Sequence, residues 1–235
     1  MVKHIGIVAC SAEGASLCYR TICTEGAHFL GGYGHPEVSM HTHSLDDYMQ
    51  CIHRADWAAV ANLMLASTTK LASIGAELVV CPDNTLHQAL PLIVHKSPIP
   101  WLHIADAVAQ EASRRGWRRV GLTGTRWLVD SEVYPDALRE RRIDYVRPGV
   151  AERDEVSRII MEELVRGVFK AESLLFLQRL IMTLKTQGCD SVVLGCTELP
   201  LILSDDNSAL PVLDSTRLLA RAALNRAIPT PSARL

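Results

Sequence analysis

The residues best suited to chemistry lie in two short polar segments, each of which begins where an apolar run ends. Residues 83–85 are Asp-Asn-Thr, and residues 196–198 are Cys-Thr-Glu. A carboxylate and a thiol can each accept and return a proton, which is the work of a general acid or base. The amide and hydroxyl groups beside them can donate hydrogen bonds to a carboxylate. The chemical interpretation of the two segments is therefore acid/base chemistry on a small carboxylate, with Asp83 and Cys196 as the candidate reacting groups.

Each of these groups also has an interpretation without chemistry. Asp, Asn and Thr satisfy the unpaired N–H groups at the start of a helix, so Asp83 can be an N-cap as readily as an acid or base. A buried cysteine can simply pack as a small apolar residue. For Cys196 we favour reactivity, because a thiol at a helix N-terminus gains thiolate character and Gly195 permits close approach of the backbone. The role of Asp83 stays open at this point.

Two histidines and three cations are candidates for contacts elsewhere on a substrate. His41 and His43 are two residues apart, so on a strand their side chains face the same side. With no third ligand nearby in the sequence, a metal site is not expected, and His41 is a candidate contact for a distal carboxylate. Arg126, Arg166 and Lys170 are candidates for a fixed positive charge, with solvated surface charge as the alternative.

The seven cysteines indicate thiols rather than disulfides. Their number is odd, they include no Cys-x-x-Cys pair, and the first residues of the chain show no secretory-signal pattern. We therefore expect a reducing, cytoplasmic location and no zinc site. Packing positions are expected for Cys18, Cys23, Cys51 and Cys189.

Composition and motifs exclude several classes of partner. The 24 Lys and Arg against 26 Asp and Glu give a net charge of −2, so no basic field for nucleic acid is expected. No run of about 18 apolar residues is present, so no membrane-spanning helix is expected. The chain lacks a Gly-x-Gly-x-x-Gly motif and a P-loop, which leaves nucleotide binding without support. A small molecule is the expected partner.

Apolar runs alternate with amphipathic segments along the whole chain, which predicts an α/β fold. The expected strands are 5–9, 37–42, 78–81 and 99–104 in the first half, and 119–123, 144–148, 191–195 and 210–214 in the second. The expected helices are 15–23, 45–52, 56–75, one from about 86, 105–115, 130–141, 152–187 with a break near Gly167, and 215–227. Such alternation is typical of mostly parallel sheets covered on both faces.

The two halves of the chain repeat the same order of elements. Residues 5–11 match residues 120–126, and residues 77–86 match residues 190–199, at nearly the same spacing. A shared spacing at two separate segments indicates a duplicated α/β unit, with chance similarity between apolar strands as the alternative. The match places the two polar segments at equivalent positions.

The predicted architecture is two pseudo-symmetric α/β lobes, each with a mostly parallel sheet flanked by helices. The first lobe is 1–104 with the helix 215–227 packing back on it, the second is 105–214, and 228–235 is a tail. Open α/β sheets bind ligands at the carboxyl ends of their strands, so we expect an active site in a cleft between the lobes. The two reacting groups would then lie on opposite walls of that cleft.

Four motifs resemble those of the aspartate/glutamate racemase superfamily, which includes hydantoin racemase, maleate isomerase and arylmalonate decarboxylase. Residues 82–87, Pro-Asp-Asn-Thr-Leu-His, are similar to the family's Pro-Cys-Asn-Thr-Ala-His, and residues 194–199 match its Gly-Cys-Thr-Glu signature. Residues 120–125 resemble its third-loop Gly-Thr motif, and residues 211–216 resemble its terminal Pro-Val-Asp-Thr-Thr stretch. The first loop is diverged, with Ala-Cys-Ser at 9–11 in place of Gly-Gly-Met. The resemblance runs over nearly the whole chain.

The resemblance implies a cofactor-independent racemase or isomerase that works as a homodimer. In that family one thiolate removes the α-proton from one face of the substrate, and a second thiol delivers a proton to the other face. Fixed donors must also hold the charge that builds on the substrate carboxylate. By this resemblance the carboxylate is held by Ser11, Asn84, Thr85, Thr125 and Thr197.

One position departs from the family pattern, because Asp83 stands where the family has its first cysteine. Reference pKa values of aspartate and cysteine differ by roughly four to five units, so an unshifted aspartate is the weaker base. Burial can raise the pKa of a carboxyl group and make it a competent acid. We expect a racemase of aspartate or glutamate with Asp83 and Cys196 as acid/base groups. The alternatives are a single-cysteine isomerase or decarboxylase of a small dicarboxylate, and a carboxylate-binding protein without catalysis.

Overall fold

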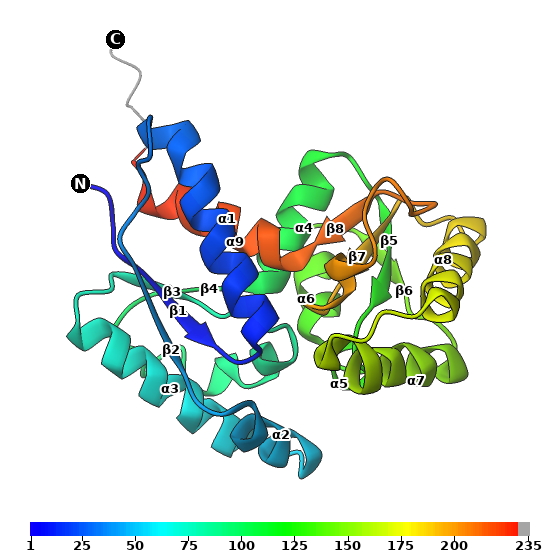
Figure 1. Ribbon diagram of the computed structural model, residues 1–235, viewed down its shortest axis with the longest axis horizontal. Coiled ribbons are helices and arrows are strands. Elements are labelled where there is room, and N and C mark those ends of the chain that lie inside the picture. The colour runs from blue at the N-terminus through cyan, green and yellow to red at the C-terminus, as the bar shows by residue number, and fades with distance from the viewer. Residues whose placement is uncertain (230–235) are drawn as a thin grey trace. The chain divides into compact units, whose positions relative to one another are not determined.

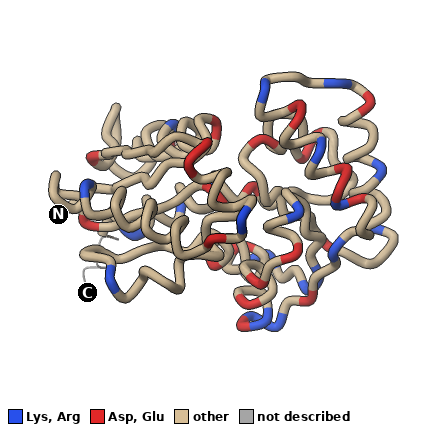
Figure 2. The backbone as a smooth tube through the Cα atoms, turned by 90° about the horizontal axis from the view of Figure 1, so that it is seen from below, with Lys and Arg blue, Asp and Glu red and all other residues tan. Residues whose placement is uncertain are grey.

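The computed structural model describes residues 1–229 and divides into two compact units. One unit is Met1–Ile104 together with the C-terminal segment that begins at Thr216, and the other is Ala105–Ser215. Each unit is built on a four-stranded parallel sheet with helices packed around it (Figure 1). The expected α/β class with two similar sheets is therefore confirmed. Acidic and basic residues are interspersed along each unit (Figure 2).

The first unit holds four strands in the spatial order β2-β1-β3-β4. They are β1 (Ile5–Ala9), β2 (Val38–Thr42), β3 (Leu78–Val80) and β4 (Trp101–Leu102). The helices are α1 (Ala12–Leu30), α2 (Leu45–His53), α3 (Trp57–Ser73) and α9 (Ser215–Ala227). Strand β1 is buried at every position and pairs with a parallel neighbour on each side, as its apolar sequence predicts.

The second unit repeats this arrangement with the spatial order β6-β5-β7-β8. The strands are β5 (Arg119–Thr123), β6 (Asp144–Val146), β7 (Ser191–Leu194) and β8 (Val212–Asp214). The helices are α4 (Ile104–Arg114), α5 (Arg126–Val129), α6 (Val133–Glu140), α7 (Val150–Arg158) and α8 (Ala171–Thr186). A π-helical turn at Ile159–Glu163 and a 3₁₀ turn at Leu164–Arg166 follow α7, and Gly167 then turns the chain with a φ of +70° at the predicted break.

The two sheets share a register as well as a strand order. Ile5 of β1 pairs with Leu78 of β3, and Val120 of β5 pairs with Ser191 of β7. In the match between the two halves of the sequence, Ile5 is equivalent to Val120, and Leu78 is equivalent to Ser191. Chance similarity between apolar strands does not account for a shared register, so the structure supports duplication of one α/β unit.

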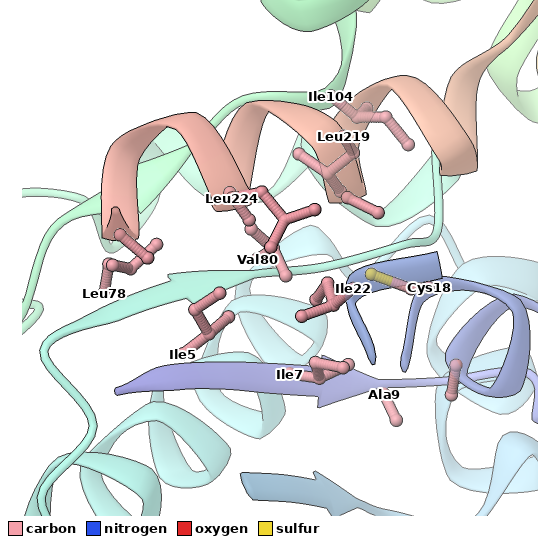
Figure 3. Packing of buried hydrophobic residues seen from close by; sticks show 14 of the residues in the cluster. Ile5, Ile7, Ala9, Cys18, Ile22, Leu78, Val80, Ile104, Leu219 and Leu224 are labelled. Atoms are coloured by element: carbon pink, nitrogen blue, oxygen red, sulfur yellow. The ribbon is translucent and has the colours of Figure 1, made fainter. Parts of the chain in front are cut away.

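The core of the first unit lies between its sheet and helices α1 and α9 (Figure 3). Its members include Ile5, Ile7, Leu78 and Val80 from the strands, Cys18 and Ile22 from α1, and Leu219 and Leu224 from α9. Burying one such aliphatic side chain contributes roughly 1.5–3 kcal/mol. The last helix of the chain therefore completes the core that the first residues begin. Ile228 also belongs to this cluster, and residues 230–235 of the predicted tail lie outside the described residues.

Short 3₁₀ turns replace the two helices that we expected after the polar segments. Two such turns lie between residues 85 and 92, where we expected an α-helix from about residue 86. A 3₁₀ turn of three residues follows the segment that contains Cys196. Pro91 and Pro200 explain the difference, because proline lacks the N–H that an α-helix needs and disfavours helical backbone in the residue before it. The expected helix N-terminus beside Cys196 was therefore wrong.

Several further helix boundaries differ from the prediction, and helix α1 ends at Leu30 rather than at residue 23. Helix α1 begins three residues earlier than expected, because the Ser11 side chain accepts a hydrogen bond from the Gly14 N–H at 3.2 Å and caps it. The segment 130–141 contains a helix only from Val133 onwards. Among the described residues, no helix combines the length and the apolar character needed to cross a membrane.

Candidate active site

The residues predicted to carry chemistry follow the ends of parallel strands in each unit. In the first unit β1 and β3 are neighbours, so Ser11 and Asp83 follow strands that end at the same edge of the sheet. In the second unit β5 and β7 are neighbours, and Thr125 and Cys196 follow their ends. Each sheet thus brings together its own set of predicted site residues.

Asp83 caps the turn that follows β3. Its Oδ1 accepts a hydrogen bond from the backbone N–H of Leu86 at 3.2 Å, and its side chain is half-buried. Asn84 beside it is buried, and Thr85 is half-buried. Asp83 therefore satisfies an N–H of this turn, although Asn84 is the residue that directly precedes the 3₁₀ turn. An acid/base role, which a capping carboxylate can also perform, stays a prediction.

The thiols beneath this turn are held in their neutral form. Cys81 is fully buried, and burial together with the nearby Asp83 carboxylate raises the pKa of its thiol well above the ordinary value. Burial also raises the pKa of Cys18 to about 12. Neither thiol is a base at neutral pH, so neither competes with the Asp83 carboxylate for an acid/base role.

His41 is half-buried, and both of its ring nitrogens have protein partners. Nδ1 lies 3.0 Å from Oγ of Ser67, and Nζ of Lys70 lies 2.9 Å from Nε2. The rings of His41 and His43 lie 5.0 Å apart on the same side, as their spacing predicts. In the part of the chain that the structure describes, no three His, Cys, Asp or Glu side chains group as metal ligands. The hydrogen bonds favour a supporting role for His41 over direct contact with a substrate.

Equivalent carbonyl groups just before the two polar turns are fixed by different side chains. In the first unit, Nε2 of the buried His87 donates to the Cys81 carbonyl oxygen at 3.0 Å. In the second unit, the Ser215 hydroxyl donates to the Leu194 carbonyl oxygen at 2.8 Å. Burial lowers the pKa of His87 well below its ordinary value, so the ring is neutral. This anchoring role was not predicted for either side chain.

Cys196 is half-exposed and already has a proton acceptor. Its Sγ donates to Oε2 of Glu198 at 2.9 Å, and Oγ1 of Thr197 donates to the same oxygen at 2.8 Å. Glu198 is only 3% exposed, so its carboxylate depends on these donors. In the sequence Glu198 is recognisable only as part of a motif, and its role as the acceptor for the thiol was not predicted. The signal was a carboxylate within an otherwise buried turn, two residues after the thiol.

A close backbone contact joins the segments that follow β5 and β7. The Gly195 N–H donates to the Thr123 carbonyl oxygen at 3.0 Å, and a Cβ at Gly195 would lie 2.5 Å from that oxygen. Gly124 lies against Gly195 with a φ of +149°, a conformation that favours glycine. The contact requires glycine at both positions, and it brings the segment with Thr125 next to the turn with Cys196.

The three predicted cations have different surroundings. Nζ of Lys170 lies 3.2 Å from Oε1 of the buried Glu163, so this charge is already paired. The guanidinium of Arg126 lies over the ring of Trp127, 5.1 Å from its centroid, and its side chain is exposed. Arg166 is also exposed. Lys170 therefore has a structural role, whereas Arg126 and Arg166 keep accessible charges.

Comparisons with known proteins agree with the motifs. The chain matches the model of the Asp/Glu/Hydantoin racemase family over residues 7–223. It is 24% identical to the broad specificity amino-acid racemase RacX of Bacillus subtilis (strain 168) over 165 residues, which cover 69% of this chain and 70% of RacX.

Solved structures are similar over almost the whole chain. A Yersinia pestis protein, provisionally assigned as an Asp/Glu racemase, is 31% identical with a TM-score of 0.88, covering 97% of this chain and 100% of that one. An aspartate racemase homologue from Pyrococcus horikoshii OT3 is 28% identical with a TM-score of 0.82, covering 96% and 99%. The matched region includes both polar turns. The chain therefore belongs to the Asp/Glu/hydantoin racemase family.

Proposed function

We propose that the protein is a cofactor-independent amino-acid racemase that acts at the α-carbon of aspartate or glutamate. Membership of a racemase family supports an enzyme of this type. The names of two relatives, an aspartate racemase homologue and a broad specificity amino-acid racemase, support an amino-acid substrate. The observation that carries the proposal is the presence of Asp83 and Cys196 at equivalent turns of a duplicated unit.

In the proposed reaction one group removes the α-proton from one face of the amino acid and the other returns a proton to the opposite face. Glu198 accepts the thiol proton of Cys196, and the resulting thiolate takes the α-proton. The electron pair of the broken C–H bond is delocalised into the substrate carboxylate. Protonated Asp83 then delivers the new proton to carbon. The reverse direction exchanges the two roles.

The charge that develops on the substrate carboxylate needs fixed donors. Both polar turns and the loops beside them offer hydroxyl and amide groups for this purpose. We assign the role to Ser11, Asn84, Thr85, Thr125 and Thr197. His41 is not in this set, because its ring nitrogens already take part in hydrogen bonds.

We also propose that the enzyme is a cytoplasmic homodimer that acts on a free small molecule, without nucleic acid or membrane. None of the seven cysteines forms a disulfide, which supports a reducing compartment. The homodimer rests on the family resemblance, and sedimentation analysis of the purified protein tests it.

A single-thiol isomerase or decarboxylase of a small dicarboxylate is the second candidate. Two observations favour it. The Asp83 carboxylate is engaged as a cap, and the Cys196 thiol has its own proton acceptor in Glu198. In that case the Cys196 turn would carry the reaction without Asp83.

Hydrogen exchange at the α-carbon separates these possibilities. The protein is incubated with each enantiomer of aspartate and glutamate in heavy water, and loss of the α-hydrogen signal is followed by NMR. We expect exchange with inversion, its loss in Cys196→Ser, and a decrease of about 10²- to 10⁴-fold in Glu198→Gln. Cys23→Ser, which changes another half-exposed thiol, is the control and should remain active.

Other outcomes identify the alternatives. Exchange of none of the four amino acids would exclude the proposed substrates. Release of carbon dioxide or loss of maleate would then favour the single-thiol enzyme. Stabilisation by a carboxylate ligand without any turnover would indicate a binding protein.

A further inference from the structure

A cavity with a basic lining lies at the edge of the second sheet where its strands begin. Its volume is about 450 Å³, and it is lined by Arg119, Arg139, Arg142, Ile143, Asp144 and Tyr145. Arg119 is the first residue of β5, and Asp144 is the first residue of β6. Cys196 follows the other end of a strand of this sheet, so the cavity is not part of the candidate active site.

Two of the three guanidinium groups in this cavity have no carboxylate partner. Arg139 forms ion pairs with Asp136 at 2.7 Å and with Glu132 at 3.5 Å, so its charge is largely balanced. Within the part of the chain that the structure describes, neither Arg119 nor Arg142 takes part in an ion pair. Their side chains are exposed, and both are therefore available to an anion that enters the cavity.

The equivalent position in the first unit differs, because its polar groups pair with one another. By the register of the two sheets, His4 and Glu37 are equivalent to Arg119 and Asp144. Nδ1 of His4 lies 3.8 Å from Oε1 of Glu37, and its Nε2 lies 2.9 Å from Oγ of Ser39. Arg119 and Asp144 are register partners but form no such pair within the described residues. The second unit thus leaves open a position that the first unit closes.

Arg142 has a backbone conformation that favours glycine. It is the second residue after α6, and its φ is +57°. The same position after α8 is Gly188, with a φ of +84°. A side chain in this left-handed conformation costs stability that glycine would not cost. Its retention is the pattern expected where binding, rather than folding, needs the side chain.

We propose that the cavity binds a small multivalent oxyanion, either a phosphate ester or a polycarboxylate, through Arg119 and Arg142. A guanidinium group presents paired N–H donors that match the oxygens of a carboxylate or a phosphate. Two such groups in one cavity favour a ligand with more than one negative charge. The volume lies within the range of small-molecule sites.

The other lining residues fit the same class of ligand. The Asp144 carboxylate can accept a hydrogen bond from a hydroxyl or amino group on the ligand. Ile143 is buried and Tyr145 is half-buried, and they offer an apolar surface to its carbon skeleton. The proposal does not depend on the proposed reaction.

Calorimetric titration of the full chain with pyrophosphate and with citrate, at an ionic strength of about 0.15 M, tests the site. We expect binding by the wild type and a loss of roughly tenfold or more in affinity in Arg119→Gln and in Arg142→Gly, since each variant loses charge-assisted hydrogen bonds. Arg179→Gln removes an exposed arginine from α8 of the same unit and is the matched control, which should bind as the wild type does.

Arg142→Gly also separates binding from folding. Because glycine readily adopts a positive φ, this variant should not lower the midpoint of thermal unfolding. A loss of affinity in a variant of unchanged or greater stability cannot come from unfolding. Arg119→Lys keeps the charge without the paired donors and should bind with intermediate affinity.

Amide NMR during the same titrations locates the bound anion. We expect shifts at Asp144 and Tyr145 in the wild type and their loss in Arg119→Gln. Shifts confined to the turns with Asp83 and Cys196 would place the anion in the candidate active site and would overturn the proposal.

The choice of probe identifies the ligand. Binding of pyrophosphate alone would support a phosphate ester, and binding of citrate alone would support a polycarboxylate. The proposal fails if the wild type binds neither anion at millimolar concentration. It also fails if Arg119→Gln and Arg142→Gly bind as the wild type does, or if Arg179→Gln loses as much affinity as they do. None of these measurements requires turnover, so failure of the proposed function would leave them unaffected.

Discussion

At the scale of single residues, the two candidate acid/base groups start from different hydrogen bonds. The Cys196 thiol donates to a buried carboxylate, whereas the Asp83 carboxylate accepts from a backbone N–H. The reference pKa values of a cysteine thiol and an aspartate carboxyl group also differ by roughly four to five units. We therefore expect the proposed racemase to remove the α-proton from the two enantiomers at unequal rates.

Substitution of Asp83 distinguishes proton transfer by its carboxyl group from the hydrogen bond that this group accepts from the turn. Asparagine caps a turn about as well as aspartate but cannot carry the proton, so Asp83→Asn should keep the fold and lose about 10²- to 10⁴-fold in α-hydrogen exchange. Asp56→Asn is the matched control, because Oδ1 of Asp56 caps α3 by accepting from the Ala59 N–H at 2.9 Å. Unchanged exchange in Asp83→Asn would assign the reaction to Cys196 alone. A large gain of racemisation in Asp83→Cys would also indicate that the wild type is built for a different reaction.

Single site residues were predictable from the sequence, but their hydrogen-bond partners were not. Asp83 and Cys196 are recognisable because each follows an apolar run, and strand ends are where such sheets bind ligands. The hydrogen bond of His41 was not predictable, because His41 and Ser67 are 26 residues apart and meet only when α3 packs beside β2. Glu198 is only two residues from Cys196, but its role became visible only from the 2.9 Å distance between its Oε2 and the thiol sulfur.

At the scale of elements, a buried carboxylate joins the end of the π-helical turn to α8. Oε2 of Glu163 accepts from the Ser173 hydroxyl at 2.6 Å, and Oε1 accepts from Arg158 at 2.8 Å and from Lys170 at 3.2 Å. These three donors lower the pKa of Glu163 to about 2. Glu163 is 2% exposed, so it stabilises this junction only while it is ionised and paired.

The low pKa of Glu163 predicts how acid affects stability. A carboxylate whose pKa falls on folding contributes fully above its unfolded value of 4.5, and the contribution is lost as the pH falls from there to about 2. In urea unfolding, Glu163→Gln should be less stable than the wild type at neutral pH and should lose less stability over that acid range. Glu172→Gln changes an exposed carboxylate on α8 and should follow the wild type. If the free energy of unfolding fell equally with pH in the wild type and in Glu163→Gln, this role of Glu163 would be contradicted.

Elements were predictable where local sequence decides the structure. Strand β5 and helix α9 have the bounds that their apolar patterns predict. The turns after Asp83 and Cys196 were not predicted, because Pro91 and Pro200 end helical backbone within a few residues of its start. The apolar pattern alone predicted helices at both positions. Proline has no N–H to donate within an α-helix, so short 3₁₀ turns form there instead.

At the scale of the whole molecule, one unit is formed by a continuous stretch of chain and the other is not. Ala105–Ser215 has its own core of strands β7 and β8 with helices α7 and α8. The unit that begins at Met1 is incomplete without α9, which contributes Leu219 and Leu224 to its core. Those two side chains account for about 3–6 kcal/mol of burial, a large part of the 5–15 kcal/mol that typically stabilises a domain.

A chain that ends after Ser215 should therefore unfold one unit and spare the other. In hydrogen exchange, the amides of β1 should lose protection and those of β5 should keep it. A chain that ends after Pro229 keeps α9 and should protect both strands. Protected β1 amides in the shorter chain would show that α9 is dispensable for this core.

The place of α9 also sets an order of events during synthesis on the ribosome. The segment that ends at Ser215 can close its core as soon as it has emerged, because all of its strands have then been made. The N-terminal half, although translated first, must wait for the final helix before its sheet is covered. Its apolar face stays open during that interval, so the half that is made first is finished last and is the one most dependent on chaperones.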